Sequence, residues 1–228
     1  EIVGTAGVAG SGESYLIEAL FGLTRPESGS KILFEGKDLT AEPPLVHRRA
    51  GIGYVPQDRM STGCNRQAMI WENAIMGYHK AHGFHSSWLL DRKQSMDFTK
   101  QVTDNFSVKY QSAYDRIASL SGGNIQKLIV GREMIQKNAL LIAEDPTRGI
   151  DVGAIEYIWE KIIDFADRGG AVLLVSHELN EVMQLSDTIK VIFNGNLYDA
   201  GRHKELNEFE IGLIMTGGDP HAAKQQEA

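Results

Sequence analysis

The sequence predicts an α/β fold in which a mostly parallel sheet is flanked by helices and carries an inserted helical subdomain. Short apolar runs alternate with helical patterns in the first and last parts of the chain, and this order builds a parallel sheet covered on its faces. Between these parts the pattern is mainly helical. We therefore expect a single domain over residues 1–218, with a core (1–60 and 120–200), a helical subdomain (about 61–119), a C-terminal helical end (about 201–218) and then a flexible tail (219–228).

The first part of the core is predicted to run as strand, glycine-rich loop and helix, followed by two more strands. The expected ranges are 2–6, 7–12, 14–21, 31–34 and 51–55. Pro56 ends the last strand, because proline has no N–H group to continue a central ladder. In the helical part, Phe98, Val102 and Phe106 recur at intervals of four and predict one apolar helix stripe.

The second part of the core resumes the alternation. We expect a helix over 123–136, a strand over 139–143, a helix ending at 169–170, a strand over 171–175 and a hairpin of strands 189–193 and 196–199. Asn194-Gly195 favours the hairpin, because these residues readily adopt the positive φ angles of a tight turn. The second helix is predicted to place its apolar side chains on one face: Ile155, Ile158, Trp159, Ile162 and Ile163.

The composition argues against several classes of protein function. The net charge of −7 argues against a nucleic-acid-binding protein, since phosphate backbones are held by clustered Lys and Arg. The single cysteine, Cys64, permits no intrachain disulfide and is expected to be an ordinary loop thiol in a reducing cytoplasm. No run of about 18 apolar residues is present, so we expect no segment that spans a bilayer. His79, His82 and His85 have no acid or thiol support for a metal, and we expect a solvated loop.

Residues 7–14 have the spacing of a P-loop, in which glycines let backbone N–H groups converge on phosphate at a helix N-terminus. Ser14 can ligate Mg²⁺ through its hydroxyl. Glu13 stands where the motif has Lys. Charges about 4 Å apart interact by a few kcal/mol near a protein surface. A carboxylate in place of the lysine therefore replaces an attraction to phosphate with a repulsion of similar size. We expect weak binding and slow turnover at this site. The candidate phosphate-binding residues are Gly7, Gly10, Ser11, Gly12, Glu13 and Ser14.

An apolar run ends in two carboxylates, Glu144 and Asp145, which is the layout that holds Mg²⁺ and polarises an attacking water. The following Pro146-Thr147 sets the register, so that Asp145 takes the position of the catalytic base and Glu144 that of the Mg²⁺-associated acid. Aspartate is one methylene shorter than glutamate, which is about 1.5 Å of reach. Misplacements of this size cost catalysis heavily, so this is a second reason to expect slow hydrolysis.

The most specific signal is a serine followed by paired glycines at a helix start, which presents a hydroxyl and backbone N–H groups to an anion. Taken by its spacing alone it could be an ordinary helix N-cap. Its place between the P-loop and the acidic strand, at the end of the helical part, favours an anion-binding role. The residues are Leu120, Ser121, Gly122, Gly123 and Asn124.

Together with Gln57, Asp151 and His177, these segments resemble the motifs of ATP-binding-cassette (ABC) ATPases. The finer sequence at 4–10, 54–59 and 146–154 resembles the second cassette of importers for simple sugars and nucleosides. The resemblance covers residues 1 to about 218 and implies a P-loop NTPase with a RecA-like core that uses ATP and Mg²⁺.

The resemblance also implies roles for single residues. Gln57 would be the Q-loop glutamine, Asp151 the D-loop acid at a dimer interface and His177 the switch histidine that contacts the γ-phosphate. Asp145, His177 and Gln57 are then the catalytic candidates, and Ser14, Gln57 and Glu144 the Mg²⁺ candidates. In two further departures from the family, Ile125 replaces a common Gln and the antiparallel strands expected ahead of Glu1 are missing.

Cassettes of this family pair head to tail, so the resemblance implies several partners. These are an N-terminal cassette of the same full-length protein, permease subunits that dock near residues 59–78, and, indirectly, a periplasmic or lipoprotein substrate-binding protein. The implied location is the cytoplasmic face of the membrane. The intact 120–124 segment would complete the partner cassette's site, whereas this chain's own site is degenerate.

Two alternatives stay open. The chain could be a regulatory module that dimerises on nucleotide and never hydrolyses it, which Glu13 favours. It could also be a non-transport cassette of chromosome maintenance, DNA repair or ribosome rescue. The short interval between P-loop and signature and the acidic charge balance argue against this second alternative.

Overall fold

A six-stranded sheet forms the centre of the molecule in the computed structural model, which describes residues 1–80, 84–86, 89–202 and 207–218. The strand order is β10-β9-β1-β8-β7-β4, and every pairing is parallel except the hairpin of β9 and β10. The strands are β1 (Ile2–Gly7), β4 (Ile52–Val55), β7 (Leu140–Glu144), β8 (Ala171–Ser176), β9 (Thr188–Phe193) and β10 (Asn196–Arg202). The predicted mostly parallel sheet is confirmed.

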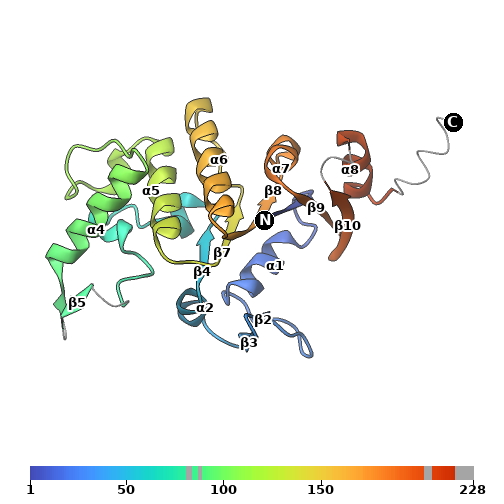
Figure 1. Cartoon of the computed structure of the whole chain (residues 1–228), viewed down its shortest axis with the longest axis horizontal. Helices are drawn as coiled ribbons and strands as arrows, with labels where there is room; N and C mark the ends of the chain where they lie inside the picture. The colour runs from blue at the N-terminus through green and yellow to red at the C-terminus, as the bar shows by residue number, and fades with distance from the viewer. Residues whose placement is uncertain (81–83, 87–88, 203–206, 219–228) are drawn as a thin grey trace.

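Helices cover both faces of this sheet (Figure 1). Neighbouring residues of β7 point to opposite faces, as the pleat of a strand requires: Leu141 joins a core cluster with α5 and α6, and Ile142 joins one with Ile17 of α1. The helices of the core are α1 (Glu13–Leu20), α2 (Pro44–Ala50), α5 (Gly122–Ile135), α6 (Val152–Asp167), α7 (Leu179–Leu185) and α8 (Glu208–Met215).

A second group of elements lies beside the sheet, at the left of Figure 1, where α4 and β5 are found. Val102 and Phe106 are buried against α5, and Phe98 packs on the same cluster, so the predicted apolar stripe is confirmed. The group comprises the π-helix η1 (Arg59–Gly63), α3 (Ile70–Ala74), β5 (His85–Ser86), β6 (Leu89–Leu90), α4 (Arg92–Asn105) and the 3-10 helix η2 (Ile117–Ser119).

Three local expectations are corrected. The strand expected over 31–34 is only β2 (Leu33–Phe34), which turns back into β3 (Lys37–Asp38), because Glu35 and Gly36 adopt the positive φ angles of a tight turn. Ile163 is 41% exposed, since the inward face of α6 is formed by Ile158 and Ile162. Cys64 does lie in a loop, but its side chain is 4% exposed within the core, and burial raises the pKa of its thiol.

A buried ionic group ties the elements beside the sheet to the core. Glu133 of α5 accepts a 2.6 Å hydrogen bond from Arg48 of α2 and another of 2.6 Å from the Tyr78 hydroxyl. Its neighbour Arg132 bonds to Glu133 Oε1 and donates to the carbonyls of Gly63 and Asn73, both at 3.1 Å. Since α5 begins at the Ser-Gly-Gly segment, this group anchors the helix that presents that segment.

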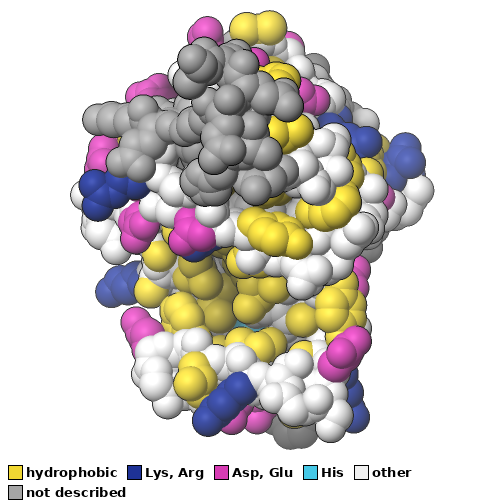
Figure 2. Space-filling view, turned by 90° about the vertical axis from the view of Figure 1, so that its right-hand side faces the viewer, with side chains coloured by type: hydrophobic (Ala, Val, Ile, Leu, Met, Phe, Trp, Pro, Cys, Tyr) yellow, Lys and Arg dark blue, Asp and Glu magenta, His cyan; other side chains and the backbone are white. Residues whose placement is uncertain are grey.

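The face that carries α8 and β10 leaves apolar side chains in contact with solvent, gathered over a hollowed region (Figure 2). On these two elements Leu197, Tyr198 and Phe209 are 53%, 45% and 70% exposed. Among the described residues, no helix combines the length and the apolar character needed to cross a membrane.

Candidate nucleotide-binding site

Four of the predicted site segments meet where parallel strands of the sheet end. Gly7 closes β1, Gln57 follows β4, Asp145 follows β7 and His177 follows β8. The carboxyl ends of parallel strands form the edge at which α/β proteins of this kind bind ligands. The structure therefore brings together residues that are up to 170 positions apart in the sequence (His177 and Gly7).

The glycine-rich loop has the shape of a phosphate cradle. Gly10 and Gly12 have φ angles of 88° and 112°, and Gly12 is the N-cap of α1. The loop is closed by a bond from the Ser11 N–H to the Val8 carbonyl, and it rests on the β9–β10 turn, where the Gly195 N–H donates to the Ser11 carbonyl at 2.8 Å. A Cβ at Gly7 would lie 2.5 Å from Ile192 Cγ2, so a larger residue there would displace the Ile192 side chain.

The Glu13 side chain turns back into this cradle. Its Oε1 accepts a hydrogen bond from the Gly10 N–H at 2.8 Å, and the residue is 4% exposed. Burial opposes its charge, but N–H groups of Glu13 and Gly10 and the His177 ring hold its pKa below the usual value. Oε2 is buried without a hydrogen-bond partner in the described structure. The carboxylate thus takes donors that a P-loop otherwise offers to phosphate.

Asp145 lies at the centre of the site. Its Oδ2 accepts from the Gln57 amide at 2.5 Å and contacts His177 Nδ1 at 2.7 Å, while Oδ1 accepts from the His177 N–H at 2.8 Å. Burial opposes ionisation, but these bonds outweigh it and lower the pKa of Asp145. The residue has a φ of 40°, a left-handed conformation that Asp tolerates better than most residues. Asp145 is held ionised by contacts on both oxygens.

Glu144 is bound differently from its neighbour. Its Oε2 accepts from the Tyr54 hydroxyl at 2.7 Å and from the Gln57 N–H at 3.2 Å. Burial, and then the bond to Glu144, raise the pKa of the Tyr54 hydroxyl, which stays a donor. Sequence reasoning missed Tyr54, which lies on β4 two residues before Pro56.

His177 joins the P-loop to the acidic strand. Its Nε2 lies 3.4 Å from Glu13 Oε1, and its Nδ1 faces Asp145. Burial disfavours a charged imidazole ring, but the bonds and charges of Asp145 and Glu13 raise the pKa of His177. The two carboxylates therefore clamp the histidine between them.

The Ser-Gly-Gly segment forms a second group with the D-loop. Ser121 is the N-cap of α5 and is exposed, and its Oγ accepts from the Asn124 side-chain amide at 2.9 Å. Asn124 in turn accepts from the Lys109 N–H, so its side chain is tied to the segment that follows α4. Asp151 caps α6 through the Ala154 N–H at 3.0 Å. Leu120 is half-buried against the core cluster.

The two glycines of this segment are close to other motifs. A Cβ at Gly122 would lie 3.1 Å from Arg59 Nη2, and one at Gly123 would lie 3.0 Å from Asp151 Oδ2. Ile125, which replaces a common Gln, is 3% exposed and belongs to the core. The next residue, Gln126, is also buried and donates to the Pro146 carbonyl at 2.7 Å. The start of α5 is thus packed directly on the loop that follows the paired acids.

The cradle of this chain holds a carboxylate where a triphosphate would bind. The Glu13 carboxylate already bonds the Gly10 N–H and would oppose phosphate charge. The Mg²⁺ candidates are only partly gathered: Gln57 bonds to Glu144, whereas Ser14 is exposed on α1 and makes no hydrogen bond to either among the described residues. No cluster of three or more His, Cys, Asp or Glu side chains that could hold a metal occurs in the described ranges.

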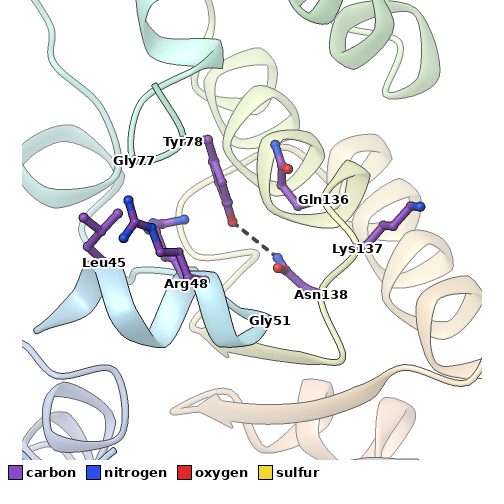
Figure 3. A pocket seen from close by; sticks show the side chains of 9 residues that line it. Leu45, Arg48, Gly51, Gly77, Tyr78, Gln136, Lys137 and Asn138 are labelled. Carbon is purple, nitrogen blue, oxygen red and sulfur yellow. Dashed lines mark hydrogen bonds between the residues drawn. The ribbon is translucent and has the colours of Figure 1, made fainter. Parts of the chain in front are cut away.

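A separate pocket of about 200 Å³ lies beside the segment that follows the Q-loop (Figure 3). Arg48, Arg49 and Lys137 line it together with Tyr78, and the Asn138 amide donates to the Tyr78 hydroxyl at 3.3 Å. The Arg48 guanidinium lies over the Tyr78 ring, 4.7 Å from its centroid. The pocket therefore has an aromatic wall and three cationic side chains in its lining, of which Arg48 is paired with Glu133.

The structure describes the three histidines expected in a solvated loop only in part. His79 is exposed, His82 lies outside the described residues, and only the backbone of His85 is described. The predicted tail, residues 219–228, also lies outside the described ranges.

The fold and this edge of the sheet define a P-loop protein of the nucleotide-binding class. The family model "ABC transporter" matches residues 1–148. The chain belongs to the ABC transporter family, and the resemblance of its motifs to those of ABC ATPases is confirmed.

Several relatives with similar sequences are import proteins. The chain is 41% identical over 217 residues to the guanosine import ATP-binding protein NupO of Bacillus subtilis, covering 95% of this chain and 42% of that protein. It is 38% identical to the nucleoside import ATP-binding protein NupA of Lactococcus lactis, covering 96% of this chain and 43% of the relative. A ribose import ATP-binding protein of Rubrobacter xylanophilus is 32% identical, with coverages of 97% and 44%. The chain thus spans less than half the length of these relatives.

Solved structures agree on the fold. A nucleotide-free ATP-binding cassette from an ABC transporter superposes with a TM-score of 0.74 at 23% identity, over 97% of this chain and 85% of that one. The ADP conformation of another ATP-binding cassette gives a TM-score of 0.72 at 22% identity, with coverages of 98% and 86%.

Proposed function

We propose that this chain is the C-terminal ATP-binding cassette of a bacterial importer of sugars or nucleosides, and that it pairs with a second cassette. The printed functions of its relatives, guanosine, nucleoside and ribose import, support the substrate class. The coverage of 42% and 43% of two relatives leaves room in such proteins for a second cassette. Residues 1–218 would form one nucleotide-binding domain with a helical subdomain over about 61–119.

A contrast between the P-loop and the start of α5 supports the proposal that the two ATP sites of a cassette pair differ in activity. The chain's own P-loop is filled by the Glu13 carboxylate, whereas Ser121 stays exposed at the start of α5. In a head-to-tail pair, Ser121 and the α5 N-terminus would complete the partner's ATP site, because the exposed N–H groups of a helix start attract anions. The chain's own site would hold nucleotide weakly and turn it over slowly.

The chain would act at the cytoplasmic face of the membrane, bound to permease subunits, with a substrate-binding protein acting indirectly. The permease is proposed to dock near residues 59–78. The pocket lined by Arg48 and Tyr78 lies at the end of this segment and supports that position (Figure 3).

Substitution of Ser121 by arginine tests the proposal. In the intact protein, in which this chain pairs with a second cassette, Ser121→Arg is expected to reduce ATP hydrolysis at least about tenfold, since the bulky cation fills the anion-binding end of α5. Ser119→Arg places the same side chain at an exposed position two residues earlier and is the matched control. Activity unchanged by Ser121→Arg would refute the proposal.

A regulatory module that binds nucleotide without hydrolysing it is a second candidate, and Glu13 is the observation that favours it. The isolated chain would then show no turnover with or without a partner cassette, and the partner's own hydrolysis would not depend on Ser121. Measuring the two rates separates the candidates.

A further inference from the structure

The segment that begins at the Q-loop glutamine runs alongside the loop between β7 and α6 (residues 145–151, the D-loop) and bonds to it at two places. The Gln57 amide donates to Asp145 at the beginning of that loop. Two residues on, Arg59 Nη1 donates to the Arg148 carbonyl at 2.5 Å and Nη2 donates to the Gly149 carbonyl at 2.9 Å. A single guanidinium therefore binds two successive carbonyls of the D-loop.

The loop is shaped to receive this group. Gly149 has a φ of 65°, which costs other residues strain, and a Cβ there would lie 3.6 Å from Arg59 Nη2. On the other side, a Cβ at Gly122 would lie 3.1 Å from the same nitrogen. The guanidinium thus lies between the D-loop and the first glycine of α5, where a Cβ at Gly122 would crowd it and the φ of Gly149 favours glycine.

The chain that follows Arg59 is also held in place by hydrogen bonds. Asp58 accepts from the N–H groups of Met60 and Ser61 at 2.9 and 3.0 Å, which begins η1. The following turn is anchored by Arg132, which donates to the Gly63 carbonyl. A change in the position of η1 would therefore move Arg59 and with it the D-loop.

We propose that Arg59 is a positioning residue for the nucleotide site shared with a partner cassette. Its guanidinium fixes the position of the D-loop relative to the glycines at the start of α5. The inference rests on the proposed function, because the surface it orders faces that shared site. Arg59 touches no reacting atom. It acts through the Arg148 and Gly149 carbonyls, and it couples the segment proposed for permease docking to the surface offered to the partner's ATP.

Three variants test this role in the intact protein. Arg59→Met removes both bonds, Arg59→Lys can restore one of them, and Arg25→Met removes an exposed cation outside the proposed site and docking segment as the matched control. We expect Arg59→Met to lower kcat about tenfold or more, with the KM for ATP changed less than about threefold, because a displaced positioning group affects the transition state more than ground-state binding. Arg59→Lys should recover part of kcat, and Arg25→Met should match the wild type.

A second readout does not depend on hydrolysis. The amides of Arg148 and Ala154 donate to Asp145 and Asp151 within the D-loop, and hydrogen exchange reports how firmly the loop is held. Their exchange should accelerate about tenfold or more in Arg59→Met and stay unchanged in Arg25→Met. Unchanged exchange, or an unchanged kcat in Arg59→Met while Ser121→Arg abolishes activity, would overturn the inference. If Ser121→Arg leaves ATP hydrolysis unchanged while amide exchange accelerates in Arg59→Met, only the proposed function is refuted.

Discussion

The Glu13 carboxylate and the Gly10 N–H, three residues apart in the P-loop, are joined by a 2.8 Å hydrogen bond. An anion that belongs to the protein therefore lies among the donors of the phosphate cradle. Glu13 does more than remove a favourable lysine charge, since its side chain takes a donor for which phosphate would compete.

Removal of this charge is expected to open the chain's own cradle. Glu13→Gln should tighten ATP binding about tenfold or more, because a repulsion of a few kcal/mol near a surface is relieved and each 1.4 kcal/mol is a factor of ten. Titration calorimetry measures the dissociation constant directly. Glu18→Gln, an exposed position on the same helix, is the control and should leave ATP affinity within about twofold. Equal affinities of the wild type and Glu13→Gln would contradict this account.

The charge on His177 should depend on both of its carboxylate neighbours. Burial disfavours the imidazolium, but Asp145 and Glu13 raise the pKa of His177 above its usual value. Its contribution to stability is therefore fully present below about pH 6.5, the pKa in an unfolded chain, and is lost as pH rises through the higher folded-state pKa. In NMR titrations Glu13→Gln should lower the pKa of His177, and Asp145→Asn should lower it as well. A pKa that neither variant changes would show that the two contacts do not form in solution.

The buried Glu133 is expected to be critical for stability. Glu133→Ala leaves Arg48 and Arg132 without their carboxylate, and breaking a buried ion pair from one side costs about 3–5 kcal/mol. Urea unfolding of the chain measures this loss as a lower midpoint. Asp97→Ala, at an exposed position of α4, should change the free energy of unfolding by less than about 0.5 kcal/mol. A Glu133→Ala midpoint equal to that of Asp97→Ala would exclude this role.

Two helical glycines should respond in opposite ways to alanine. Gly131 of α5 faces Phe106, and an added Cβ would lie 2.7 Å from its ring, so Gly131→Ala should cost about 1–3 kcal/mol through overpacking. Gly212 of α8 has open space around it, and Gly212→Ala should be neutral or stabilising by up to about 1 kcal/mol because alanine favours the helix. Thermal unfolding of both variants tests the pair. A neutral or stabilising Gly131→Ala would show that close packing against Phe106 does not limit position 131.

Much of the site could be predicted from local patterns. The glycine spacing of residues 7–12 and the apolar run before Glu144 follow from short stretches of chain, and parallel strands bring their carboxyl ends to one edge. Arg59 was part of a recognisable stretch, but its partners lie about 90 residues further along the chain, and no local pattern indicates them.

The sequence by itself determined the order of strands and helices, the family and the charge reversal at Glu13, because each of these is written in neighbouring residues. Only the tertiary structure decided that the Glu13 carboxylate folds back onto Gly10, that Cys64 is buried and that Arg59 spans the D-loop and the start of α5. The physical reason is that a side chain's direction and burial depend on the groups that surround it in space, and most of these come from distant parts of the chain.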